Sequence, residues 1–490
     1  MHPLSTTALK SARAPLDDRG HTGRTMMSRP TSLGVRVVSA WTLARRPGGT
    51  LHEAIAPLHD TGFRALWLST FAWNFARWME MTITSWAALQ LTGSPWLVAL
   101  IGVARTVALP VSGPITGALS DRLDRLQMIR SSGWVNVSVM AGIAASLVTG
   151  AGAYWQLFVG SLWLGASWGI DWPVRRSLLA DFVGPDRVLP AIVLDNVAFN
   201  VARVVGPLVA GSALAAWGAP GAFVLLATAF LVASLSVWAV PSAGARRHVV
   251  GRPSIVRDLR LGYDYVRADP LVAGVILVSL FMNVLAFPYQ GMLSVVADDV
   301  LHVGPAELGG LGAATGIGAA VGVFLQPLFR STRAQGLAFI FGAMTGATFL
   351  VAFSVSSTYP LSLALLFLVG LGTSSFGTMQ SSLVLSRSSP PMRGRAMGMV
   401  TLAIGSAPIG ALFVGALADR FGVAVAIGGS SFACLVIVVA IAARLGMFGR
   451  SLVAAPDRPG DRLDATAVLA EASPAVGVEA EPITSTGGAR

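Results

Sequence analysis

The sequence predicts an all-α membrane protein that crosses the bilayer twelve times. Twelve apolar stretches lie between Arg64 and Gly446, and the loops between them mostly alternate between basic and uncharged. Hydrophobic residues make up 54% of the chain and charged residues only 12%, about half the charged fraction of an ordinary soluble domain. Because a helix of roughly 20 apolar residues spans the hydrocarbon core, composition and spacing together indicate a polytopic membrane protein.

The twelve predicted spans form two groups of six. We place the first six at about 65–90, 95–119, 127–149, 153–175, 190–217 and 219–240. We place the other six at about 270–297, 306–329, 335–356, 359–385, 396–418 and 421–445. The predicted domains are therefore an N-terminal half over 64–240, a central loop over 241–269 and a C-terminal half over 270–446. We expect disordered tails at 1–63, which ends in an interfacial segment, and at 447–490.

The distribution of arginine predicts the orientation of these spans. The second, fourth and central loops carry several arginines each, whereas the first, third and fifth loops carry no charge. Cytoplasmic loops are enriched in Lys and Arg, so the pattern places both termini and the central loop in the cytoplasm. Only the eleventh loop, with Asp419 and Arg420, is ambiguous. The expected location is the cell membrane.

Composition also excludes several functions. The net charge of +11 does not indicate nucleic-acid binding, because the basic residues lie in alternate loops and tails and not on one face. The chain has no Gly-rich phosphate loop, no Cys/His metal cluster and no nucleophile elbow, and Cys434 is its only cysteine. We therefore expect no enzyme activity, cofactor or metal. A twelve-span chain without a soluble domain is usually a transporter, here expected to be monomeric, with a small-molecule substrate.

Charged residues inside the predicted spans are the first candidates for function, because each costs about 2.5–3.5 kcal/mol on insertion scales. Glu80 lies mid-span with Arg77 three residues before it, on the same helix face. Glu80 is either the proton carrier, with Arg77 tuning it, or half of a structural ion pair. Asp171 is the second candidate carrier. Its neighbour Arg175, one helical turn on, favours a structural pair, and a conformational switch is the alternative.

Two further arginines lie deep in the first half. Arg105 and Arg203 are expected either to pair with Glu80 and Asp171 across helices or to face a cavity. We favour Arg105 as the substrate contact and Arg203 as structural. Since three mid-span arginines oppose two carboxylates, an acidic or zwitterionic substrate is weakly favoured. The predicted cavity residues are Asn74, Arg77, Arg105, Asn200, Asn283, Gln290 and Gln380, and aromatic residues such as Trp78 and Tyr289 either line the cavity or pack against lipid.

One loop carries a recognisable motif. The segment after the second span, Gly117-Ala-Leu-Ser-Asp121-Arg122-Leu-Asp124-Arg125, resembles the major facilitator signature G-x-x-x-D-R-x-G-R-[RK]. The resemblance implies that Asp121 caps a facing helix and that Arg122 and Arg125 join a cytoplasmic charge network, which latches the outward-open state. Asp124 stands where the family has Gly, so the latch is expected to be wired differently.

A second motif lies in the fifth span. Arg203-Val-Val-Gly206-Pro207-Leu-Val-Ala-Gly211 is similar to the G-P-x-x-G motif of proton-coupled exporters in this superfamily. Glycine lets a facing helix come close and proline bends the helix. The stretch from Asp171 through Asn200 resembles the enterobactin-exporter-like and macrolide-exporter-like branch.

This resemblance implies the major facilitator fold of two six-helix halves and a proton-coupled exporter that works by alternating access. The implied substrate is an amphipathic small molecule such as a siderophore, drug or secondary metabolite. The alternatives are an importer or lipid translocator on the same fold, and a membrane sensor or scaffold that transports nothing.

Overall fold

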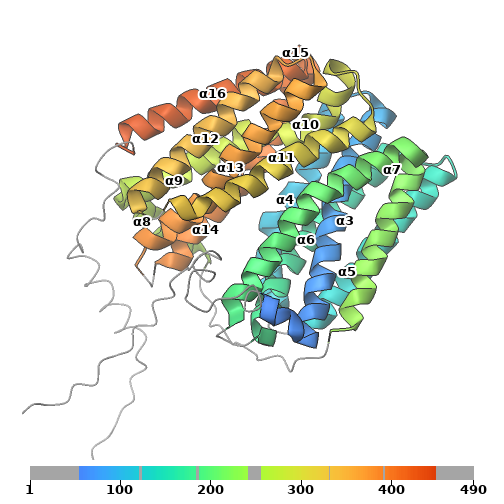
Figure 1. Cartoon of the computed structure of the whole chain (residues 1–490), viewed down its shortest axis with the longest axis horizontal. Coiled ribbons are helices and arrows are strands. Elements are labelled where there is room, and N and C mark those ends of the chain that lie inside the picture. The colour runs from blue at the N-terminus through green and yellow to red at the C-terminus, as the bar shows by residue number, and fades with distance from the viewer. Residues whose placement is uncertain are drawn as a thin grey trace, which may run out of the picture. The chain divides into compact units, whose positions relative to one another are not determined.

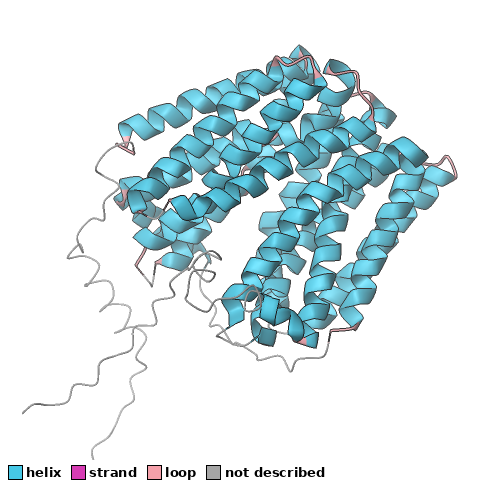
Figure 2. Ribbon diagram, viewed as in Figure 1, coloured by secondary structure: helices cyan, strands magenta, loops and turns pink. Residues whose placement is uncertain are grey.

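The computed structural model describes residues 55–120, 124–183, 187–240, 255–329, 331–389 and 392–447, and these ranges contain helices and short connections without a strand (Figure 2). The predicted tails lie mostly outside these ranges, as do residues 241–254 of the predicted central loop. The helices before the central loop are α3 (Thr61–Thr92), α4 (Pro95–Ser120), α5 (Arg125–Val148), α6 (Tyr154–Val183) and α7 (Val188–Trp238). Those from the central loop onward are α8 (Ile255–Ala268), α9 (Pro270–Phe281), α10 (Tyr289–Val295), α11 (Pro305–Leu325), α12 (Thr332–Ser354), α13 (Tyr359–Arg387), α14 (Arg393–Ile404), α15 (Ala407–Phe421) and α16 (Val423–Arg444).

Each of the twelve predicted spans falls on helix. The fifth and sixth are both in α7, whose backbone breaks at Gly218, with φ 65° and ψ −173°. Only glycine adopts that conformation without strain, so the predicted boundary at residue 218 is a true change of direction. Within the part of the chain that the structure describes, eight helical stretches are long and apolar enough to cross a membrane. Neither α3, which carries Arg77 and Glu80, nor α6, which carries Asp171, is among the eight, and the apolar stretch Pro95–Ala108 of α4 is shorter.

Local sequence explains where several helices begin and end. Asp60 caps α3, because its Oδ1 accepts a hydrogen bond from the Phe63 amide at 2.8 Å. The helix ends at Gly93, which has the left-handed conformation typical of a C-terminal glycine. Asp124 caps α5 in the same way, accepting from the Leu126 amide at 2.8 Å. The departure from the family signature at residue 124 therefore supplies a helix cap.

The seventh predicted span is not a regular α-helix. Between α9 and α10 the chain forms a π-helical turn at Met282–Ala286, and a second one follows at Val296–Val300. Such turns break the regular hydrogen-bond ladder and are frequent at functional sites. Asn283, one of the predicted cavity residues, lies in the first of them.

Helices on either side of the central loop pack against each other as well as within their own group. Before the loop, α3 packs against α7 and α4 against α6, while after it α12 packs against α13 and α16 (Figure 1). Contacts across the loop join α7 to α11 and α4 to α15. The α7–α11 seam, formed by residues 203–211 and 305–316, depends on glycine. A methyl group on Gly211 would lie 2.3 Å from the Pro305 carbonyl oxygen, and one on Gly309 would lie 2.5 Å from that of Pro207.

Candidate functional site

Glu80 lies at the centre of a buried charge cluster. Its Oε1 accepts a hydrogen bond from Arg105 Nη2 at 2.9 Å, and its Oε2 lies 3.6 Å from Arg77 Nη1. The glutamate is fully buried, and both arginine side chains are 8% exposed. One carboxylate therefore faces two guanidinium groups. When all three groups are ionised, the Glu80 cluster has one positive charge in excess.

Helix geometry accounts for this arrangement. Arg77 and Glu80 are three residues apart on α3, so they share a face, whereas Arg105 comes from α4. Gly165 of α6 allows the close approach that holds α4 in place, because a methyl group there would lie 2.0 Å from the Arg105 carbonyl oxygen. The guanidinium of Arg77 also stacks over Trp168, 5.0 Å from the ring centre. The sequence predicted the pairing of Arg105 with Glu80 as one of two alternatives.

Asp171 lies in a separate network of neutral polar groups. Its Oδ2 accepts hydrogen bonds from the hydroxyls of Ser132 at 3.2 Å and Ser167 at 3.4 Å. The network continues from Ser167 to Asn136, which donates to the Ser167 hydroxyl at 3.0 Å. Trp163 in turn donates to the Asn136 carbonyl at 2.8 Å. The Asp171 Oδ1 is buried and has no hydrogen-bond partner among the described residues.

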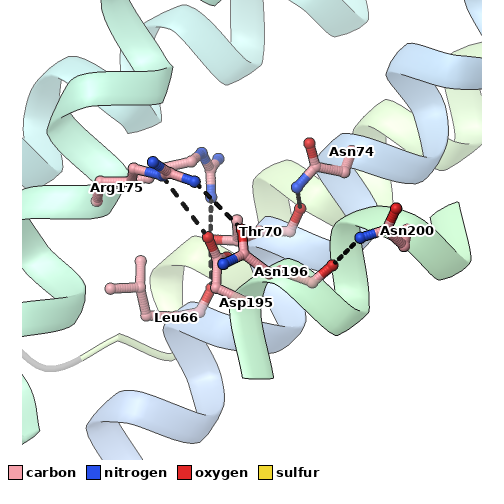
Figure 3. Close-up of polar contacts among 8 residues, drawn as sticks. Leu66, Thr70, Asn74, Arg175, Asp195, Asn196 and Asn200 are labelled. Carbon is pink, nitrogen blue, oxygen red and sulfur yellow. Dashed lines mark hydrogen bonds and ion pairs between the residues drawn. The ribbon is translucent and has the colours of Figure 1, made fainter. Parts of the chain in front are cut away.

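Asp171 and Arg175, which the sequence predicted to pair, interact through their charges. They make no ion pair within 4.0 Å, because the Arg175 side chain turns toward α3. Its Nη1 donates to the hydroxyls of Ser69 at 3.1 Å and Thr70 at 3.4 Å. Figure 3 shows Arg175 directed at Thr70 beside the start of α7, where Asp195 lies. These hydroxyls belong to a different helix, so the four-residue spacing of Asp171 and Arg175 could not identify them as partners. Asp171 meets serines from α5 and α6 instead.

Most of the predicted cavity residues make local contacts. The side-chain amides of Asn74, Asn200 and Asn283 each donate to the backbone carbonyl four residues earlier (Figure 3 shows the first two). Gln380 of α13 donates to the Ser279 hydroxyl of α9. Arg77 and Arg105 belong to the Glu80 cluster. Of the seven predicted residues, Gln290 lines a cavity found among the described residues, and the other six do not line it.

That cavity lies among α3, α7, α10 and α11. It has a volume of about 50 Å³ and is lined by residues including Trp78, Ser85, Arg203, Pro207, Tyr289 and Gln290. Arg203, for which the sequence left both a structural role and a cavity position open, lines this cavity, with its guanidinium 5.5 Å from the centre of the Trp78 ring. Thr315 also lines the cavity but was not among the predicted residues. It is a single threonine in a glycine-rich helix, and nothing else in that sequence marks it as functional.

The two motif segments are only partly described. In the second motif, Gly206 brings α7 against α3, because a methyl group there would lie 2.7 Å from Trp78 Cβ. Pro207 and Gly211 form the α7–α11 seam, as given above. In the first motif, Gly117 lies in α4, while Asp121 and Arg122 lie outside the described residues.

Arg125, the last residue of the first motif, forms an exposed ion pair with Asp181 of α6, at 3.2 Å. Salt bridges between exposed side chains contribute little to stability. This one joins the start of α5 to the end of α6.

Comparison with solved structures defines the class of protein. The chain matches the nucleoside transporter NupG with a TM-score of 0.62 at 14% identity, covering 79% of this chain and 98% of that one. It matches a bacterial homologue of the human lysosomal transporter Spinster, in an inward-facing and unoccupied conformation, with a TM-score of 0.63 at 14% identity, covering 82% and 98%. The fold is therefore that of the major facilitator transporters.

Comparison of sequences identifies the family within that class. The model of the family described as "transmembrane secretion effector" matches residues 52–477, and the chain belongs to this family of major facilitator proteins. The enterobactin exporter EntS of Shigella boydii is 23% identical over 378 residues, which cover 77% of this chain and 90% of the relative. The staphyloferrin A transporter of Staphylococcus aureus is 21% identical over 393 residues, covering 76% and 93%.

These findings confirm the resemblance to the enterobactin-exporter-like branch. The chain is a multi-pass membrane transporter of a bacterial cell membrane and not an enzyme.

Proposed function

We propose that this chain is a proton-coupled exporter of an amphipathic small molecule such as a siderophore, with both termini in the cytoplasm. The names of the relatives support the direction and the substrate class, since one is an enterobactin exporter and another a staphyloferrin A transporter. A secondary transporter needs a group inside the membrane that can gain and lose a proton. The chain offers two such candidates, Glu80 and Asp171.

The observation that carries the proposal is the position of Glu80 between Arg77 and Arg105. A buried carboxylate held by two cations has its charge compensated, and protonation would remove that charge and leave two like-charged arginines facing each other. Arg105 is on α4 and the other two are on α3, so protonation would weaken the α3–α4 contact. A proton arriving at Glu80 would thereby change how these two helices pack.

The second candidate carrier, Asp171, differs in its surroundings. Its partners are neutral hydroxyls of Ser132 and Ser167, and protonation would supply a donor where Oδ1 now lacks a partner. Asp171 therefore takes second place, as a group that could share the proton with Glu80 or replace it.

Alternating access requires the two groups of helices to rock against each other. The α7–α11 seam supports this step, because glycine at 211 and 309 brings the two backbones together without interlocking side chains. Smooth contacts of this kind separate and close again at low cost. We assign the rocking to this seam, with Gly206 and Pro207 as the residues that shape α7.

The test is an accumulation assay in efflux-deficient cells. Cells expressing the wild type or Glu80→Gln would be loaded with a panel of radiolabelled or fluorescent amphiphiles that includes an acidic siderophore, with and without an uncoupler. Expression in the membrane is checked for both proteins. We expect the wild type to lower accumulation of at least one compound, and both the mutation and the uncoupler to abolish that effect.

Other outcomes have distinct meanings. Export that survives Glu80→Gln but not Asp171→Asn would move the carrier role to Asp171. Substrate-dependent uptake into intact cells would indicate an importer and overturn the proposed direction. If no compound responds although the protein is in the membrane, the proposed function fails and a lipid translocator or a sensor takes its place.

A further inference from the structure

The cavity among α3, α7, α10 and α11 is small and partly open. Its volume of about 50 Å³ is about a third of the roughly 150 Å³ of an engineered protein cavity that binds benzene. That space suits a single polar group such as a carboxylate. The rest of a ligand would have to lie outside it.

The cavity contains a cation without an acidic partner. Among the described residues, Arg203 has no carboxylate within 4.0 Å and makes no hydrogen bond; its close neighbours are the Trp78 ring and the Tyr289 hydroxyl. The two carboxylates that the sequence offered as partners are engaged elsewhere, Glu80 by two arginines and Asp171 by serines. A guanidinium away from water gains most from an anion that accepts its paired N–H groups.

Tyr289 supplies a second potential donor in the same cavity. It is 2% exposed and lines the cavity, and its hydroxyl lies beside Thr315, Gln290 and Arg203 without a well-formed hydrogen bond among the described residues. A buried hydroxyl whose hydrogen bonding is incomplete costs free energy, so its position at the cavity wall points to an acceptor that enters. The Gln290 side chain also lines the cavity and offers an amide donor.

We propose that this cavity binds one anionic group, of the carboxylate class, of the exported molecule. Arg203 binds the anion and Tyr289 donates a second hydrogen bond. The inference rests on the proposed export function and narrows its substrate class to anionic amphiphiles. Trp78 places an aromatic face beside the cation, where an apolar or aromatic part of the substrate can pack.

The position of this anion subsite has a consequence for coupling. Trp78 and Ser85 of α3 face the cavity, whereas Glu80 of the same helix contacts Arg77 and Arg105. The substrate anion and the proton therefore occupy different faces of α3 and do not compete for one group. The anion also joins α7 to α10, one before and one after the central loop, so its binding favours the state in which these helices are together.

The test measures binding directly, with benzoate as the anionic probe and benzamide as its neutral counterpart. Ligand-detected NMR titrations use the full-length purified protein in lipid nanodiscs. We expect the wild type to bind benzoate at least tenfold more tightly than benzamide, and Arg203→Gln to lose that preference, because a charged hydrogen bond contributes about a factor of ten or more. Tyr289→Phe should weaken benzoate binding about threefold, as expected for one neutral hydrogen bond.

Matched controls separate binding from folding. Arg64→Gln removes an exposed arginine 14 residues before Trp78 on the same helix, about 21 Å along the axis, and should leave the preference unchanged. Arg203→Lys keeps the charge and should retain part of the preference. Every variant must elute as a single species.

Two results would overturn the inference: a wild type that does not distinguish benzoate from benzamide, or an Arg203→Gln protein that still does. The outcomes also separate this inference from the proposed function. Anion binding that needs Arg203 in a protein that exports nothing would keep the subsite and reject the exporter. Export that depends on Glu80, together with a benzoate preference that does not depend on Arg203, would keep the exporter and reject the subsite.

Discussion

The α7–α11 seam makes a quantitative prediction about conformational equilibrium. In Gly211→Ala the new methyl group would lie 2.3 Å from the Pro305 carbonyl oxygen, whereas ordinary van der Waals contact begins at 3.4 Å. The atom that it meets is backbone, which cannot rotate away. The two helices must therefore separate by about 1.1 Å at this point or deform.

The energetic consequence follows from known costs of overpacking. Inserting a methyl group into a close-packed contact costs about 1–3 kcal/mol. If only the state with the seam closed bears this cost, the equilibrium shifts toward separated helices by about 5–150-fold. The cavity behind the seam should then become accessible for a larger share of the time.

Cysteine labelling measures this accessibility. The only cysteine, Cys434, is buried, so Cys434→Ala provides a background in which Ser85→Cys reports on the cavity. We expect Gly211→Ala to accelerate labelling of the reporter by a water-soluble maleimide at least fivefold. Gly102→Ala is the matched control, because a methyl group there meets nothing within 4 Å. Equal labelling rates in the parent and in the Gly211→Ala protein would refute the argument.

Two further predictions concern ion pairs in different environments. Arg105→Met should destabilise the protein by about 3–5 kcal/mol, because it removes one partner from a buried pair. Thermal unfolding of the double variant with Glu80→Gln should show that part of this stability is recovered. Strictly additive effects of the two substitutions would contradict the pairing. Arg125→Gln should change stability by less than about 1 kcal/mol, because its partner Asp181 is 43% exposed. If Arg125 acts in a cytoplasmic latch, the variant should export more slowly, and exchanging the charges of residues 125 and 181 should restore the rate. A large drop in melting temperature would instead show a structural role.

The periodic features of the chain could be predicted from the sequence. The apolar stretches gave each of the twelve helical ranges, including the break at Gly218 inside α7, because a bilayer forces the backbone to satisfy its own hydrogen bonds. The irregularities within spans were not predictable in this way. The π-helical turn at Met282–Ala286 inserts one residue per turn without altering hydropathy, so composition carried no sign of it.

The partners of the buried charges were also predictable only in part. The sequence identified Arg77, Glu80, Arg105, Asp171 and Arg203 as candidates for function, since a charge deep in a span is costly and its depth can be read from the sequence. Spacing along one helix then found the partner of Glu80 on α3. For Asp171 the spacing identified Arg175 as the nearby charge, but not the hydrogen-bond partners, which are serines on α5 and α6.

The sequence by itself determined that this protein lies in a membrane, where its helical stretches lie and which charges are buried, because each of these follows from local transfer energies. Only the tertiary structure decided which charge meets which. It placed Arg105 on Glu80 and Arg203 at a cavity with Tyr289, whereas the sequence left both pairing and a cavity position open for each arginine. The reason is physical: a side chain's partners depend on which faces of separate helices meet, and no local pattern along one helix specifies that packing.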